Sequence, residues 1–257
     1  MKNQVIKKAS ALGFVSVGFT TADAQDYVSI FEEAISSGRI ASMKWLARNP
    51  KMRCDPKALL PNARSVICLA YPYGECGIVP EEMKTNKRAL SVPREPARAR
   101  FARGAEYHEF IRGRLELLRQ YLLELAPEAT TKLCVDTSPL LEKALAQRAG
   151  IGWIGKHTIL LNKKLGSWFL LGEIITDLKF KPDAPAKNLC GECSLCIDAC
   201  PTRAISRAGR LDARLCISYH TTAAKEVPPP AVAKFFKKGQ YGCDICQEAC
   251  PYNLQTR

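Results

Sequence analysis

The chain has 257 residues, a formal charge of +13 and 12 cysteines. Its hydrophobic fraction of 47% and charged fraction of 25% are ordinary for a globular protein and exclude a disordered chain. The sequence contains no apolar run of the ~18 residues that a membrane-spanning helix requires, and its start lacks the apolar segment of a secretory signal. We therefore expect a cytoplasmic protein without a membrane partner, whose thiols stay reduced and either bind metal or lie buried.

The first 180 residues predict a mixture of helices and strands. Apolar residues at helical spacing predict a helix near the amino terminus and a long helix from about Glu106 to Ala126. Alternating or continuous apolar residues predict strands at 15–20, 65–71 and 132–136.

The segment after the third strand predicts one more helix and a hairpin. Ser138-Pro139 predicts the helix start, because proline is tolerated in a first turn, and Gly150 predicts its end. Segments 157–161 and 167–171 flank a polar turn and predict a β-hairpin. An antiparallel pair among helices and strands indicates an α/β or α+β fold, which we expect to form one domain over residues 1–180.

Eight of the cysteines lie in the last 68 residues, after a link rich in proline and charge at 179–188. The first four read Cys190-x-x-Cys193-x-x-Cys196-x-x-x-Cys200-Pro201, which is the run of bacterial ferredoxins. In that run three thiolates hold one 4Fe–4S cluster and the fourth reaches a second cluster. We therefore expect a bacterial-ferredoxin-like domain with two 4Fe–4S clusters over residues 181–257.

The second cysteine run, Cys243-x-x-Cys246-x-x-x-Cys250-Pro251, has Gln240 where a leading cysteine would stand, and Cys216 is the spare thiol nearby. The expected ligands are Cys190, Cys193, Cys196 and Cys250 for one cluster, and Cys200, Cys216, Cys243 and Cys246 for the other. Two structural Cys₄ zinc sites are the alternative. Zinc pairs usually come as two separated Cys-x-x-Cys knuckles, so the spacing favours iron–sulfur clusters.

A glycine-rich loop, Gly150-Ile-Gly152-Trp-Ile-Gly155, matches the letters of a dinucleotide-binding fingerprint. That fingerprint must follow a strand and open a helix, so that the pyrophosphate meets a helix amino terminus. Here the loop follows a predicted helix and leads into a predicted strand. The context argues against nicotinamide binding, although the glycines allow a bulky cofactor to approach the backbone.

Asp136 is the candidate catalytic residue, because it ends an apolar strand at a strand-to-helix turn. A carboxylate desolvated in a cleft there would have a raised pKa and would hold a proton near neutral pH. The alternative is that Asp136 only caps the helix that follows.

The central part of the chain contains two long motifs, Val135-Asp-Thr-Ser-Pro-Leu-Leu-Glu-Lys-Ala-Leu-Ala-Gln-Arg-Ala-Gly-Ile-Gly-Trp-Ile-Gly-Lys-His-Thr158 and Gly166-Ser-Trp-Phe-Leu-Leu-Gly-Glu173. With these motifs the chain strongly resembles the epoxyqueuosine reductase family. Shorter matches are Trp45-Leu-Ala-Arg48, Tyr107-His108, Leu211-Asp-Ala-Arg-Leu-Cys-Ile-Ser-Tyr219 and Tyr241-Gly-Cys-Asp-Ile-Cys246. The resemblance implies a cobalamin-binding domain, two 4Fe–4S clusters and reduction of epoxyqueuosine to queuosine at the wobble position of tRNA. Family members are related to cobalamin-dependent reductive dehalogenases, and many continue past the second cysteine run with helical repeats, so we expect a short form lacking that region.

The resemblance also implies roles for individual residues. Asp136 matches the proton donor and Arg48 an arginine near the corrin. Backbone around His157, Thr158 and Leu160 would line the cobalamin, as would Ser218. The cofactor would be bound base-off, and electrons would pass from the Cys190 cluster to the Cys216 cluster and on to cobalt. We expect an external electron donor such as flavodoxin or ferredoxin, and a monomer.

A basic stretch from Lys84 to Arg114 predicts a tRNA-binding face, because phosphate contacts dominate such affinity. Phe101, Tyr107 and Phe110 lie within it and are candidates for stacking on a base. A solvated surface that serves only solubility is the alternative. Two other functions stay open, a cobalamin-dependent reductase of a small molecule and an electron-transfer partner without its own substrate.

Overall fold

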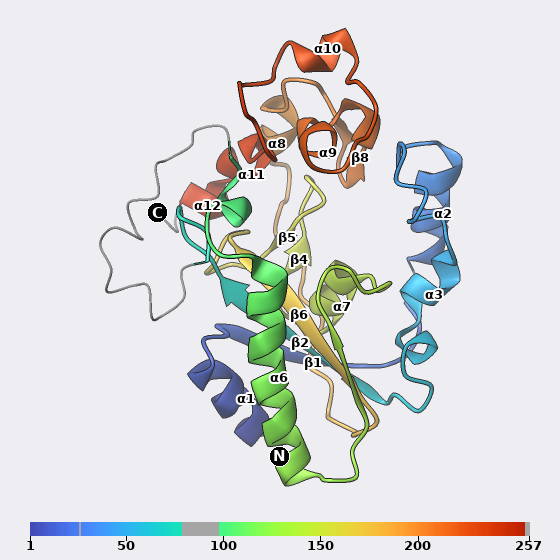
Figure 1. Ribbon diagram of the computed structural model, residues 1–257, viewed down its shortest axis with the longest axis vertical. Coiled ribbons are helices and arrows are strands. Elements are labelled where there is room, and N and C mark those ends of the chain that lie inside the picture. The colour runs from blue at the N-terminus through green and yellow to red at the C-terminus, as the bar shows by residue number, and fades with distance from the viewer. Residues whose placement is uncertain (26, 79–97, 255–257) are drawn as a thin grey trace.

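The computed structural model describes residues 1–25, 27–78 and 98–254. Its sheet lies next to the cysteine-rich residues 189–254, which carry the expected clusters and are called the cluster-bearing part (Figure 1). The sheet is built from β1 (Ser16–Thr21), β2 (Ser65–Pro72), β6 (Phe169–Thr176) and β3 (Thr131–Cys134), in the order β1-β2-β6-β3. Every neighbouring pair is antiparallel. The expected mixed fold is therefore confirmed in its α+β form.

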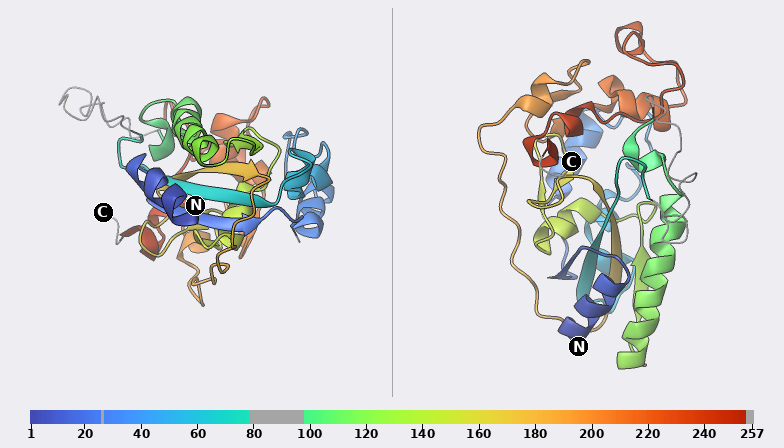
Figure 2. Two further views of the ribbon diagram at one scale, coloured as in Figure 1. Left: turned by 90° about the horizontal axis from the view of Figure 1, so that it is seen from below. Right: turned by 90° about the vertical axis from the view of Figure 1, so that its left-hand side faces the viewer.

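Helices cover both faces of the sheet, with α6 and α7 on opposite sides (Figure 2). One face packs against α1 (Lys2–Ala11) and α6 (Tyr107–Leu125), and the other packs against α7 (Glu142–Arg148). Because β2 and β6 are central strands with a helix layer on each side, both run almost entirely through the interior.

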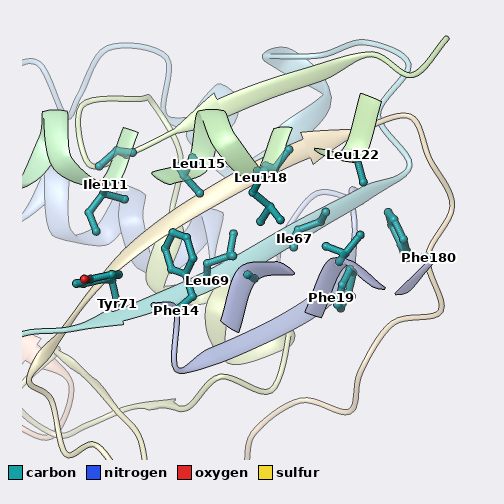
Figure 3. Close-up of a cluster of buried hydrophobic side chains, with 14 of the residues drawn as sticks. Phe14, Phe19, Ile67, Leu69, Tyr71, Ile111, Leu115, Leu118, Leu122 and Phe180 are labelled. Atoms are coloured by element: carbon teal, nitrogen blue, oxygen red, sulfur yellow. The ribbon is translucent and has the colours of Figure 1, made fainter. Parts of the chain in front are cut away.

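The long helix α6 forms where its apolar periodicity predicts it. Its buried residues repeat every three or four positions and lie over Ile67 and Leu69 of β2 (Figure 3); they are Ile111, Leu115, Leu118 and Leu122. The Glu106 side chain accepts the backbone N–H of Glu109 at 2.9 Å and caps the first turn.

The remaining elements of the sheet-containing part lie in the segments that connect its strands and helices. An excursion between β1 and β2 carries α2 (Val28–Ser36), α3 (Pro50–Cys54) and a 3₁₀ turn, Pro56–Ala58. A short hairpin pairs β4 (Trp153–Ile154) with β5 (Leu160–Leu161) beneath the cluster-bearing part (Figure 1). Another 3₁₀ turn, Arg100–Ala102, precedes α6.

The cluster-bearing part consists of short helices joined by loops. Its elements are α8 (Leu195–Asp198), β7 (Ile205–Arg207), β8 (Arg210–Leu211), a 3₁₀ turn at Ala213–Leu215, α9 (Ile217–Thr222), α10 (Pro230–Ala233), α11 (Ile245–Glu248) and α12 (Pro251–Leu254). None of the helices within the described ranges is long and apolar enough to span a bilayer.

Buried hydrogen bonds join the cluster-bearing part to the sheet. The Ser167 N–H donates to Asn253 Oδ1 at 2.6 Å, and the Ser167 hydroxyl donates to Gln247 Oε1 at 2.8 Å. The Arg100 N–H donates to Asp244 Oδ2 at 2.8 Å. These bonds satisfy polar groups that burial would otherwise penalise, while the boundary near residue 180 stays a prediction.

Two local predictions are wrong. Segment 157–161 does not pair with 167–171, because β5 pairs with β4, and residues 169–176 form a central strand of the main sheet. Helix α7 begins at Glu142 rather than at Ser138-Pro139, because residues 137–140 form bends.

Truncating Leu118 to alanine should destabilise the protein by about 2–5 kcal/mol, because it deletes a fully buried side chain from the layer between α6 and the sheet. Leu117→Ala is the matched control, since its side chain is 48% exposed and its loss should cost under about 1 kcal/mol. Chemical denaturation measures both, and equal losses would contradict this packing.

Candidate functional site

Asp136 lies at the end of β3, two residues beyond the last paired strand residue, in a left-handed backbone conformation with φ of 46°. Its Oδ2 is 3.0 Å from His108 Nε2, and the Tyr107 hydroxyl also hydrogen-bonds to its carboxylate. The side chain is 60% exposed. The expectation of a desolvated carboxylate at this position is therefore wrong, because the turn places it at the surface.

His108 links Asp136 to a second carboxylate, Glu106. Its ring stacks on Tyr107 with centroids 3.9 Å apart, and its Nδ1 faces Glu106 Oε1. Burial lowers the pKa of His108, but the hydrogen bonds to Glu106 and Asp136 outweigh burial and leave the pKa above its ordinary value. His108 can therefore hold a proton beside Asp136 near neutral pH.

A second pair of carboxyl groups lies behind the Asp136 turn. Glu142 Oε1 accepts the Asp136 backbone N–H at 2.6 Å, and Glu173 is fully buried in β6. Burial raises the pKa of Glu142 to about 7, and burial together with Glu142 raises the pKa of Glu173 well above its ordinary value. Glu142 and Glu173 therefore keep their protons to higher pH than free carboxyl groups do.

Sequence reasoning missed Glu142 and Glu173, although one signal pointed to Glu173. It stands among apolar residues in Phe169–Thr176, at a position where the sheet faces inward. Its cross-strand neighbours are Cys68 and Cys134, both buried. No hydrogen-bond donor reaches either Glu173 oxygen from the described residues. An ionisable residue in an apolar strand is a signal of function or of a shifted pKa.

The first expected set of cysteines surrounds one open cavity of about 300 Å³. Cys190, Cys193, Cys196 and Cys250 line it together with His157 and Tyr252. Cys196 and Cys250 are buried whereas Cys193 is exposed. The Trp153 indole N–H donates to Cys190 Sγ at 3.4 Å. This cavity can hold a cluster with one ligand near solvent.

The second expected set surrounds a smaller, mostly apolar cavity. Cys200, Cys216, Cys243 and Cys246 line it between β7, β8 and α9. Burial raises the pKa of Cys243 to about 11, and the N–H groups of Ser218 and Tyr219 hydrogen-bond to Cys216. All eight cysteines are free thiols. Within the described ranges, no three His, Cys, Asp or Glu side chains form a group that could hold a single metal ion.

The other expected cofactor-binding residues differ in how exposed their side chains are. Arg48 is exposed after α2, and Thr158 is partly exposed with φ of 69°. Ser218 is partly exposed in the first turn of α9. Leu160 belongs to the hydrophobic core, and His157 lies buried against the first cysteine cavity. Burial and Lys143 lower the pKa of His157 to about 4, so it is neutral.

Two arginines in the described part of the basic stretch, Arg100 and Arg114, are held in intramolecular contacts. The residues Lys84, Lys87, Arg88 and Arg94 of this stretch lie outside the described ranges. Arg100 is buried with its guanidinium 4.1 Å above the Trp168 ring, and Arg114 donates to the Leu12 carbonyl. Phe110 is partly buried and packs against the core, with its ring centroid 5.0 Å from that of Tyr71, and its stacking on a base stays a prediction.

Comparison with known proteins gives two family matches. Residues 53–137 match the model described as epoxyqueuosine reductase QueG, DUF1730, and residues 189–253 match a 4Fe-4S double cluster binding domain. An epoxyqueuosine reductase of Aliivibrio fischeri is 37% identical over 256 residues, covering 100% of this chain and 67% of the relative. The chain belongs to the epoxyqueuosine reductase family. It spans about two thirds of the length of such relatives.

Solved structures of the epoxyqueuosine reductase family agree with this assignment. An epoxyqueuosine reductase bound to an epoxyqueuosine-modified tRNA stem loop superimposes with a TM-score of 0.84 at 33% identity, covering 99% of this chain and 66% of that chain. A structure of the Bacillus subtilis enzyme has its aspartate-bearing catalytic loop swung out of the active site. It superimposes with a TM-score of 0.83 at 33% identity, covering 98% of this chain and 65% of that chain. The reductive dehalogenase NpRdhA shares the fold, with a TM-score of 0.57 at 15% identity. The match covers 97% of this chain and 31% of the dehalogenase.

Replacing Glu173 with glutamine should stabilise the protein by on the order of 1–3 kcal/mol at pH 8, because a buried carboxylate without a donor is penalised when it ionises. Its folded pKa lies above the ordinary value of 4.5, so the native state binds more protons and stability falls as pH rises through this window. The difference between Glu173→Gln and wild type should therefore shrink at pH 5. Denaturant titrations at both values measure it, with exposed Glu124→Gln as control; a difference that does not change with pH would refute the account.

Proposed function

We propose that this chain reduces epoxyqueuosine in tRNA to queuosine. The observation that carries the proposal is the exposed Asp136 carboxylate, held by His108 and Tyr107 in a chain that also contains a double 4Fe–4S cluster domain. Reduction of an epoxide to an alkene consumes two electrons and two protons and releases the oxygen as water. The site needs an acid at the surface and a supply of single electrons, and this arrangement offers both.

The proton side of the reaction falls to Asp136 and His108. We assign Asp136 the protonation of the epoxide oxygen as the ring opens, in agreement with the aspartate on the catalytic loop of the B. subtilis relative. His108 Nε2, 3.0 Å from Asp136 Oδ2, is placed to return a proton to it. Its raised pKa keeps that proton available near neutral pH.

The electron side falls to the two cysteine sets. We propose that Cys190, Cys193, Cys196 and Cys250 hold one cluster and that Cys200, Cys216, Cys243 and Cys246 hold the other. The four members of each set line one cavity, and no disulfide competes for them. Exposed Cys193 gives an external donor, such as flavodoxin or ferredoxin, a short path to the first cluster. We expect the chain to act as a monomer.

Cobalamin would supply, when bound, the reducing metal centre that side chains cannot provide. We propose Arg48, Thr158 and Ser218 as its contacts, because Arg48 is exposed and the other two are partly exposed, so all three present polar groups to solvent. His157 and Leu160 would contribute backbone only, since their side chains are buried. None of the three histidines offers a free exposed ring nitrogen: His108 binds Asp136, His157 is buried, and His220 Nε2 binds the Arg214 carbonyl. This fits base-off binding.

Anaerobic reconstitution with iron, sulfide and cobalamin tests the activity. With a chemical reductant and epoxyqueuosine-containing tRNA, the nucleoside should lose the mass of one oxygen. Asp136→Asn should lower turnover by about 10²-fold or more, because it removes the acid, while absorbance of the clusters and of cobalamin stays unchanged. Exposed Asp23→Asn is the control. Full turnover by Asp136→Asn would remove its catalytic role.

Binding of the modified anticodon stem-loop should weaken steeply with salt, because each phosphate contact releases counterions. A protein with +13 formal charge should show a negative slope of log Kd⁻¹ against log salt that corresponds to several contacts. Fluorescence anisotropy at low and moderate salt measures it. No binding at low salt would rule out tRNA as the substrate and favour a small molecule.

A further inference from the structure

The strained conformation of Asp136 requires something to hold it. A non-glycine residue with φ of 46° lies in the left-handed region, which persists only where surrounding contacts fix it. His108 and Tyr107 contact its side chain, but neither contacts its backbone N–H. The bond to that N–H comes from the first residue of α7, through Glu142 Oε1 at 2.6 Å.

Glu142 has a buried carboxyl group, Glu173, as its neighbour in β6. Glu173 lies fully buried in β6, and burial together with the charge of Glu142 raises its pKa. The neighbouring Glu173 in turn lowers the pKa of Glu142. The pKa of Glu173 is raised well above its ordinary value, so Glu173 is protonated at neutral pH and can donate toward Glu142. A central strand of the sheet is thereby connected, through two carboxyl groups, to the turn that carries Asp136.

We infer that Glu142, backed by Glu173, is a positioning residue that fixes the Asp136 turn in the conformation presenting its carboxylate to the substrate. Glu142 does not touch the reacting atoms; it acts through the Asp136 backbone. The inference rests on the proposed function for its catalytic consequence, but the structural restraint itself is independent of any substrate.

The restraint predicts a difference between two substitutions at one position. Glu142→Ala removes the acceptor, so the Asp136 amide should exchange its hydrogen at least about 10-fold faster, the factor that loss of about 1.4 kcal/mol of local protection produces. Glu142→Gln keeps a side-chain oxygen in place and should restore protection. Hydrogen exchange with mass spectrometry on the peptide containing Asp136 measures both in the full-length chain. Peptides from β2 and β6 report whether the fold is intact, and exposed Glu124→Ala is the control.

Kinetics of the reconstituted enzyme provide the second readout. Glu142→Ala should lower kcat at least about 10-fold with KM for the tRNA within about 2-fold of wild type, because substrate binding is kept while the acid is misplaced. Glu142→Gln should recover most of the loss. Unchanged Asp136 exchange in Glu142→Ala, or a Glu142→Gln variant as defective as Glu142→Ala, would overturn the inference. A wild type that shows the exchange pattern but no epoxyqueuosine turnover would refute the proposed function and leave the restraint standing.

Discussion

The exchange of cysteines between the two runs is the constraint on which the carboxyl-terminal part depends. Cys200 leaves its own run to join the set around Cys216, and Cys250 leaves the second run to join the set around Cys190. Neither set is complete until the last helices fold back onto the first run. The same last helices contribute Gln247 and Asn253, whose hydrogen bonds reach Ser167 at the entrance to β6. The same last helices therefore complete both thiol sets and attach them to the sheet.

In the sheet-containing part, the burial of Glu173 lowers stability, but it places a carboxyl group behind the turn that carries Asp136. The sheet buries a glutamate at 173 with no hydrogen-bond donor for its oxygens among the described residues, which costs stability whenever the group ionises. In return, a rigid strand reaches the turn bearing Asp136 through Glu142. Natural proteins accept such local penalties mainly at functional sites. The arrangement allows an exposed acid on a turn to be held by the interior of the sheet.

The sequence predicts what local chemistry decides. The expected cysteine grouping rests on ligand spacing and on Cys216 as the spare thiol nearby, and the members of each set line one cavity. Helix α6 follows from an apolar repeat that only a helix accommodates. The position of Asp136 at a strand end was also predictable. Its exposure was not, because the residues that hold it arrive from other elements: His108 from α6 and Glu142 from α7. The hairpin at 157–171 fails for the same reason, since the partner of β6 is set by the whole sheet.

The unequal burial of the first thiol set has a practical consequence. Cys193 is exposed, whereas Cys196 and Cys250, which line the same cavity, are buried. In the metal-free chain an alkylating reagent therefore reaches Cys193 first and the other two only after local opening. The order in which these thiols are alkylated therefore reports whether the cluster site is occupied, without optical or magnetic spectroscopy.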